Sequence, residues 1–231
     1  MSEKPRILIT GFQPFPGAPY NPTEKLVERL LRLRRPAFDS IERIGHIFPV
    51  TYGAVNRQLP ALIETHRPDA LLMFGLAART PFVRIETRAR NTVTQIWPDA
   101  EHTQVESRTI ASNADATRRF GPHTLRLLRA AQLTGVDARL SLSAGYYLCN
   151  YLSWRALEAT RLENGPRLAA FIHVPLVPRR PIERRTGARD RMTFEHLVDA
   201  GEALLLEMAR LARHQAAAFL AANPSGSHTG S

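Results

Sequence analysis

The chain has 231 residues, of which 44% are hydrophobic, and this is enough apolar material for one sizeable core. Its net charge is +10. No apolar run approaches the roughly 18 residues of a membrane span, and no signal segment opens the chain. The single cysteine excludes a disulfide within the chain, and a free thiol suits a reducing cytoplasm. We therefore expect a cytoplasmic globular protein without membrane contact.

The first half of the chain predicts strands and helices in alternation. A strand over residues 6–10 is followed by a loop rich in glycine and proline. A helix over residues 22–34 then begins with Asn21 as its N-cap, and Glu24 stands where it would complete a capping box. The further elements expected here are a helix over 54–65, broken or bent at Pro60, a strand over 70–75 and an irregular polar stretch over 92–120.

The second half continues the alternation. A helix over 123–134 ends at Gly135, which suits a left-handed cap. The elements expected after it are a strand over 138–142, a helix around 148–157, a strand over 168–172, a helix over 193–222 and a disordered tail over 223–231. This pattern predicts one α/β domain over residues 1–222. Its architecture should be a three-layer sandwich, with a largely parallel, twisted sheet flanked by helices.

Cys149 is the first candidate for chemistry. It follows a turn of small residues in SLSAGYYLCN, at the junction of a predicted strand and a predicted helix. The first turn of a helix carries unpaired N–H groups and a partial positive charge, which favour the nucleophilic thiolate. Two interpretations are open: a nucleophile, or a small buried apolar residue that opens a helix.

His173 is a candidate base for such a nucleophile. It ends the apolar run 168–172, and Pro175 and Pro178 prevent the strand from continuing. A histidine at this position is well placed to line a cleft. The alternative is a capping or hydrogen-bonded surface histidine.

Glu86 is a candidate orienting group for the base. It lies within an apolar alternation, on the face opposite to Val83 and Ile85. The alternative is a solvated carboxylate that pairs with Arg84 or Arg88.

Three aromatic or reactive side chains fall just after predicted strands, namely Phe12, Cys149 and His173. In open α/β sheets, ligands bind beyond the carboxyl ends of the strands, so these side chains are expected to share one site. The loop TGFQPFPG, which carries Phe12 and Phe15, lacks the glycine patterns of a phosphate loop. Its two rings suit an apolar binding surface, or else both belong to the core.

Four blocks in this order resemble the pyroglutamyl peptidases (pyrrolidone-carboxylate peptidases), cysteine peptidases that remove an N-terminal 5-oxoproline from peptides. The blocks are ILITGFQPFPGAPYNP, GLAARTPFVRIETRARN, SLSAGYYLCN and FIHVPLVP. They are similar to the family's opening T-G-F-x-P-F, its glutamate block, its cysteine block S-x-x-A-G-x-x-x-C-N and its histidine block F-I-H-x-P-x-x-P. The resemblance runs from about residue 6 to about residue 178.

The resemblance implies a catalytic triad in which Cys149 is the nucleophile, His173 the base and Glu86 the group that orients the imidazole. It implies peptide substrates with an N-terminal pyroglutamate, a homo-oligomer (dimer or tetramer), and no cofactor or metal. Pyroglutamate is a flat, uncharged lactam, so its pocket should offer apolar faces and few polar groups. The side chains that the resemblance places there are Phe12, Phe15, Asn21, Leu76, Tyr147 and Leu148. Asn21 either contacts the loop or substrate, or only caps its helix.

The chain also departs from the family pattern. The differences are Ala78, Arg79 and Thr80 in the glutamate block, and Ile96 and Ala100 after it. Ile96 stands where the family usually has an arginine near the substrate carbonyl. We therefore expect weaker stabilisation of the oxyanion and slow hydrolysis of simple pyroglutamyl amides, unless Arg88 or Arg90 takes that place.

Other functions stay open. One is a related thiol hydrolase that acts on another small amide or lactam, and another is a non-catalytic binding homologue. An arginine-rich segment could also bind phosphate backbones; it contains Arg179, Arg180, Arg184, Arg185, Arg189 and Arg191. No interleaved aromatic residues or nucleic-acid motif accompany it, so we expect a solvated loop and no specific nucleic-acid partner.

Overall fold

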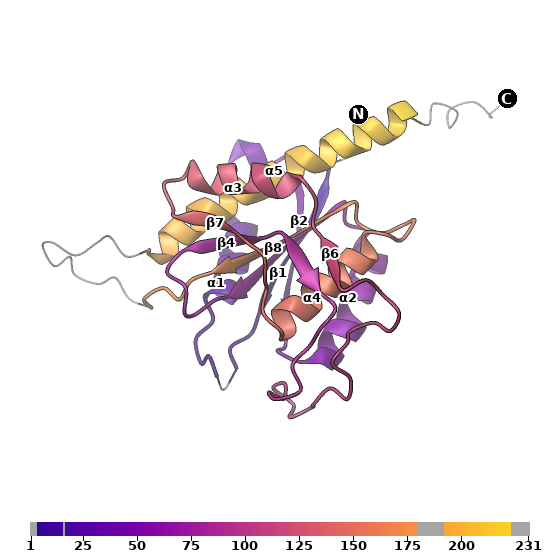
Figure 1. Ribbon diagram of the computed structural model, residues 1–231. Helices are drawn as coiled ribbons and strands as arrows, with labels where there is room; N and C mark the ends of the chain where they lie inside the picture. The colour runs from indigo at the N-terminus through magenta and orange to yellow at the C-terminus, as the bar shows by residue number, and fades with distance from the viewer. Residues whose placement is uncertain (1–3, 16, 180–191, 223–231) are drawn as a thin grey trace, which may run out of the picture.

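The structure is a computed structural model that describes residues 4–15, 17–179 and 192–222. The expectations for the arginine-rich segment beyond Arg179 and for the tail 223–231 lie outside the described residues. The main sheet has six strands in the order β2-β1-β3-β8-β4-β7 (Figure 1). Their bounds are β1 (Arg6–Phe12), β2 (Glu42–Phe48), β3 (Ala70–Leu76), β4 (Val83–Glu86), β7 (Ala138–Ser141) and β8 (Leu168–Val174). Two short strands, β5 (Arg88–Arg90) and β6 (Thr117–Arg119), form a separate antiparallel pair.

Four of the five strand pairings in the main sheet are parallel, which confirms the prediction of a largely parallel sheet. The exception is the antiparallel pairing of β4 with β8, which also reverses β7, because β7 is parallel to β4. The expectation that the site lies at the carboxyl ends of parallel strands therefore holds for Phe12 in β1 and His173 in β8. It does not hold for Cys149, because β7, the strand before it, runs in the opposite direction. The segment 142–147 leads from β7 into the helix that carries Cys149.

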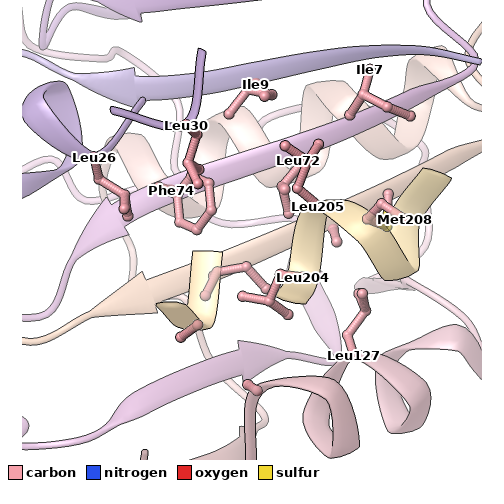
Figure 2. Packing of buried hydrophobic residues seen from close by; sticks show 14 of the residues in the cluster. Ile7, Ile9, Leu26, Leu30, Leu72, Phe74, Leu127, Leu204, Leu205 and Met208 are labelled. Carbon is pink, nitrogen blue, oxygen red and sulfur yellow. The ribbon is translucent and has the colours of Figure 1, made fainter. Parts of the chain in front are cut away.

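Helices cover both faces of the sheet, so the predicted three-layer sandwich is confirmed (Figure 1). One face packs against α1 (Pro22–Arg32), α3 (His123–Gln132) and α5 (Phe194–Ala222), and the other against α2 (Tyr52–His66) and α4 (Leu148–Ala159). A short 3-10 helix, η1 (Pro36–Phe38), precedes β2. Figure 2 shows the first interface, where leucines of α1, α3 and α5 meet side chains of β1 and β3.

The two-residue period of the strands decides which side chains face which helices. In β8, Ala170 and Ile172 belong to the core under α5, whereas Phe171 belongs to the core under α4. His173 is two residues from Phe171 and therefore lies on the α4 side. In β4, Val83 and Ile85 belong to the α5 side, which leaves Arg84 and Glu86 on the α4 side. His173, Arg84 and Glu86 therefore all point to the α4 side of the sheet.

The expected elements are present, with bounds that differ by a few residues, and four strands, β2, β4, β5 and β6, were not among them. Strand β2 is half-exposed along most of its length and carries Glu42, Arg43 and His46. Such an edge strand lacks the apolar signal by which strands are found. Strand β6 lies within the stretch 92–120, which was expected to be irregular. Gly135 has the expected positive φ, 86°.

Two local expectations for helices can be compared with the structure. Asn21 is the N-cap of α1, as expected. Its side chain accepts a hydrogen bond from the backbone N–H of Thr23, whereas in the expected capping box the partner would be the N–H of Glu24. Helix α2 runs unbroken through Pro60, so of the two expectations for this position, a break or a bend, the break is wrong. Pro60 is exposed, and water can compensate for the backbone hydrogen bond that a proline removes. In the described ranges, no helix combines the length and apolarity needed to cross a membrane.

The core under α5 should dominate the stability of the fold. Leu205 is fully buried there, so Leu205→Ala should lower the free energy of unfolding by about 2–5 kcal/mol through lost burial and an unfilled cavity. The matched control is Leu133→Ala, because Leu133 is 79% exposed and its loss should change stability by about 0.5 kcal/mol or less. Urea unfolding followed by circular dichroism measures both. Equal effects of the two variants would contradict the packing described here.

Candidate active site

The sheet face under α4 brings together Glu86, His173 and Cys149. Glu86 is the last residue of β4, and His173 is the last but one of β8. These two residues are 87 positions apart in the chain, so they meet only because β4 and β8 pair. Cys149 is the second residue of α4, which packs on the same face.

Glu86 and His173 form a buried hydrogen-bonded pair. The Nδ1–H of His173 donates to Oε1 of Glu86 over 2.8 Å, and Glu86 has no exposed surface. Burial alone would raise the pKa of Glu86, but hydrogen bonds and charge, chiefly from His173, hold that pKa below its ordinary value. Burial also lowers the pKa of His173, and this outweighs the opposite effect of Glu86. At neutral pH the pair is a carboxylate and a neutral imidazole whose Nε2 can accept a proton.

Arg84 is a third charged group in this region. Its Nη2 donates to Oε1 of Glu86 and to the carbonyl oxygen of Ser143, each over 2.6 Å. Its Nε donates to the same Oε1 over 3.1 Å, and Nη2 lies 3.3 Å from Nδ1 of His173. The alternative for Glu86 was a solvated carboxylate that pairs with an arginine. The pairing with Arg84 is present, but the carboxylate is buried and not solvated.

Gly75 in β3 allows the sulfur of Cys149 to lie directly against the sheet. A Cβ atom at Gly75 would stand 2.9 Å from Sγ of Cys149 and 2.7 Å from the ring of Phe171. Gly75 pairs in register with His173 on the next strand, so the sulfur lies beside the histidine. Among the described residues, the hydrogen-bonding partners of the His173 ring are Glu86 and Arg84, and the sulfur is not one of them.

The thiol of Cys149 is protonated in this resting arrangement. The residue keeps some exposed surface, but burial raises the pKa of its thiol to about 12, and the negative charge of Glu86 adds to this effect. The start of α4 favours a thiolate, as expected from the sequence, but desolvation outweighs that contribution. The resting state is therefore a neutral thiol beside a neutral imidazole, not a thiolate–imidazolium pair.

The segment in front of Cys149 is held by arginines of β5. Nε of Arg88 donates to the carbonyl oxygen of Leu142 over 2.8 Å, and Nη1 of Arg90 donates to the hydroxyl of Tyr146 over 2.6 Å. Both arginines that were expected as replacements for a substrate-binding arginine thus bind this segment. Ile96, at the position of that arginine, is 79% exposed.

The side chains expected at a substrate pocket have different surroundings. Phe15 and Tyr147 are half-buried neighbours, with ring centroids 6.3 Å apart. Phe12 and Leu148 are buried in the core under α4, where Phe12 packs against Phe48 with centroids 6.0 Å apart. The rings of Phe15 and Tyr147 therefore offer the more accessible apolar surface.

The remaining two expected residues lie at the ends of elements. Leu76 is the last residue of β3 and is half-buried. Asn21 is buried; its Oδ1 accepts from the N–H of Thr23 over 3.1 Å, and its Nδ2 donates to the carbonyl oxygen of Gln13 over 3.4 Å. Asn21 thus caps α1 and also contacts the preceding loop, so its role is not limited to capping.

Sequence reasoning assigned no functional role to Gly75 or Arg84. A glycine inside a strand is a known sign of close approach by another group, and this signal was present at Gly75. Arg84 shares its strand face with Glu86 because the two are two positions apart in the strand. The direction of β4, which puts Arg84 opposite His173, has no local sequence signal.

Two other features of the described residues were considered as sites. No three histidine, cysteine, aspartate or glutamate side chains in ranges 4–15, 17–179 and 192–222 are grouped to hold a metal ion. A cavity of about 900 Å³ lies between α2 and α4, lined among others by Leu59, Ile63 and Arg155. It reaches the residues just before β3 and β8, at the opposite end of these strands from His173, and Glu86, His173 and Cys149 do not line it.

Comparisons with known proteins identify the family of this chain. A family model described as pyroglutamyl peptidase matches residues 5–210. Pyrrolidone-carboxylate peptidase of Pyrococcus furiosus is 30% identical over 179 residues, covering 78% of this chain and 85% of the relative. The protein of that name from Vibrio vulnificus strain CMCP6 is 32% identical over 203 residues, covering 87% and 91%. The solved pyrrolidone carboxyl peptidase from Thermococcus litoralis is similar with a TM-score of 0.78 at 27% identity, covering 91% of this chain and 96% of that one.

The protonation state of Cys149 can be tested directly, because the chain has no other cysteine. A thiol pKa of about 12 means that the thiolate fraction rises about tenfold per pH unit through the neutral range. The alkylation rate with iodoacetamide should therefore increase steadily from pH 7 to pH 10, with Cys149→Ser as the unreactive control. A rate that is already high and constant between pH 6 and pH 8 would indicate a resting thiolate instead.

Proposed function

This chain belongs to the pyroglutamyl peptidase family, and we propose that Cys149, His173 and Glu86 are the groups with which it removes N-terminal pyroglutamyl residues from peptides. The observation that carries this assignment is the buried hydrogen bond of 2.8 Å between His173 and Glu86, beside a sulfur that lies against Gly75. A base oriented by a carboxylate next to a thiol is the arrangement that nucleophilic catalysis requires.

The first half of the reaction forms an acyl-enzyme. Nε2 of His173 takes the proton of the Cys149 thiol as Sγ attacks the pyroglutamyl carbonyl carbon. The imidazolium, stabilised by the Glu86 carboxylate, then donates that proton to the leaving amine as the C–N bond breaks. Because both partners are neutral at rest, the thiolate is produced when the substrate is in place.

The second half releases pyroglutamate. A water molecule gives a proton to Nε2 of His173 and attacks the thioester carbon. The C–S bond breaks, the proton returns from the imidazolium to Sγ, and free pyroglutamate leaves. His173 therefore acts as base and acid in turn in each half, and Glu86 keeps the same orientation throughout.

The start of α4 is suited to stabilise the oxyanion. Helices α1 and α2 have side-chain caps, from Asn21 and Thr51, that accept hydrogen bonds from their first turns. No side-chain cap is present on α4, whose N-cap is Tyr147. Its first backbone N–H groups and the positive end of its dipole can serve the negative oxygen that develops next to Cys149.

The proposed substrate site combines apolar faces with few polar groups. Phe15 and Tyr147 present half-buried rings to a flat lactam, and the Tyr147 hydroxyl donates to the carbonyl of Pro98 over 2.8 Å, which fixes its ring. Phe12, Leu76 and Leu148 supply the apolar wall behind them. In this proposal Asn21 acts indirectly, by holding the loop that carries Phe15.

The same proposal includes a cytoplasmic location and a homo-oligomer. A single thiol that must stay reduced for catalysis suits a reducing compartment. Several large apolar side chains are exposed, among them Ile96, Trp97 and Leu176, and contact between copies of the chain would cover some of this surface.

A pair of fluorogenic amides tests the function. Pyroglutamyl amide should be cleaved, whereas prolyl amide, which lacks the ring carbonyl and has a charged amine in place of the neutral lactam N–H, should not. Cys149→Ser should lower kcat by about 10³-fold or more with unchanged circular dichroism, because serine has no comparable anionic fraction. Cleavage of neither amide by a protein whose thiol is alkylated normally would favour another small amide as substrate, and an active Cys149→Ser variant would refute the role of the thiol.

Gly75→Ala tests the position of the sulfur. The added methyl group would stand 2.9 Å from Sγ of Cys149, so the sulfur must move, and a displacement of about 1 Å costs about 100-fold in kcat. The matched control is Gly53→Ala, where the methyl group meets only the flexible end of Arg57. Steady-state kinetics with the pyroglutamyl amide measures both variants. Equal kcat values for Gly75→Ala and the parent would show that the close approach is unimportant.

A further inference from the structure

Arg84 contacts two of the three proposed catalytic residues and the segment that leads to the third. It binds the carboxylate of Glu86 through two nitrogens, and Nη2 lies 3.3 Å from Nδ1 of His173. The same Nη2 donates to the carbonyl oxygen of Ser143, in the segment that leads to Cys149. One guanidinium group thus joins β4, β8 and the segment before α4.

All of these contacts with the carboxylate fall on a single oxygen. Oε1 of Glu86 accepts from Nε and Nη2 of Arg84 and from Nδ1 of His173, whereas Oε2 is buried without a hydrogen bond of its own in the described structure. A buried carboxylate stays ionised only where opposite charge and donors compensate for the lost water. The side chain of Arg84 is 21% exposed and supplies that charge when His173 is neutral.

We propose that Arg84 is a positioning residue of the reaction: its forked contacts hold the Glu86 carboxylate against His173 and fix the segment in front of Cys149. This role rests on the proposed function of the triad. Arg84 touches no reacting atom, so it acts through Glu86, His173 and the backbone of Ser143.

The direction of the pH effect follows from the charges around His173. Glu86 and Arg84 face it from β4, Cys149 lies beside it from α4, and β3 contributes the uncharged Gly75. Burial lowers the pKa of His173, Glu86 raises it, and the positive charge of Arg84 lowers it further. A base works only while it is unprotonated. Removal of Arg84 therefore raises the pH below which activity is lost.

Three variants separate charge from geometry. Arg84→Gln removes the charge, so the acid limb of kcat/KM should move up by about one pH unit, and kcat should fall about 10- to 100-fold. Arg84→Lys keeps the charge but not the forked contacts, so the acid limb should stay near that of the parent while kcat still falls. The control is Arg139→Gln, because Arg139 is in register with Arg84 on β7 but pairs with Asp137 at the surface, and its loss should change neither quantity.

A readout independent of turnover is the NMR titration of the His173 imidazole, identified by the signal that disappears in His173→Gln. Its midpoint should rise in Arg84→Gln and be restored in Arg84→Lys. A merely structural arginine would reduce stability or kcat without moving this midpoint, and that result would overturn the proposal. If Arg84→Gln does not fold, Arg84→Lys still decides, since a lysine variant with parental kcat would show that the forked contacts are dispensable.

Failure of this inference can be told apart from failure of the proposed function. A parent protein that cleaves no pyroglutamyl amide refutes the function, whatever Arg84 does to the histidine. An active parent with an unchanged His173 midpoint in Arg84→Gln refutes only the role of Arg84.

Discussion

The burial of one carboxylate constrains the rest of the site. Glu86 has no exposed surface, so its charge must be matched from within the protein. Arg84 supplies positive charge from the same face of β4, and His173 donates a hydrogen bond from β8. His173 lies opposite Arg84 because β4 runs antiparallel to β8. The reversed direction of β4 is therefore tied to the contact between Glu86 and His173.

The sheet separates structure from function by face. The face under α1, α3 and α5 holds a large cluster of buried apolar side chains, part of which Figure 2 shows. The face under α2 and α4 is apolar at its centre, but near the end of β8 it carries His173, Arg84 and Glu86. Because side chains alternate along β8, this one strand contributes to both faces of the sheet. An apolar layer on one face thus lies behind the charged groups of the candidate site on the other face.

Much of this molecule was predictable because its local signals are strong. The helices, the buried strands and the position of Cys149 at the start of a helix follow from periodicity, caps and turns. Strand β2 was missed because its exposed edge carries charged residues. The direction of β4, the contacts of Arg84 and the approach of the sulfur to Gly75 depend on tertiary packing, for which the chain carries no local pattern. The raised pKa of the Cys149 thiol also has no local signal, since desolvation reflects the surroundings and not the helix start.

The enclosure of Cys149 has a consequence for the lifetime of the protein under oxidative stress. Peroxides attack thiolates, so a thiol that is almost fully protonated reacts slowly with them. This matters because the chain has no second cysteine that could trap a sulfenic acid as an internal disulfide before it is oxidised further. Protection must come from low reactivity at rest. A buried thiol with a raised pKa should therefore react more slowly with oxidants than an exposed thiolate at the same position would.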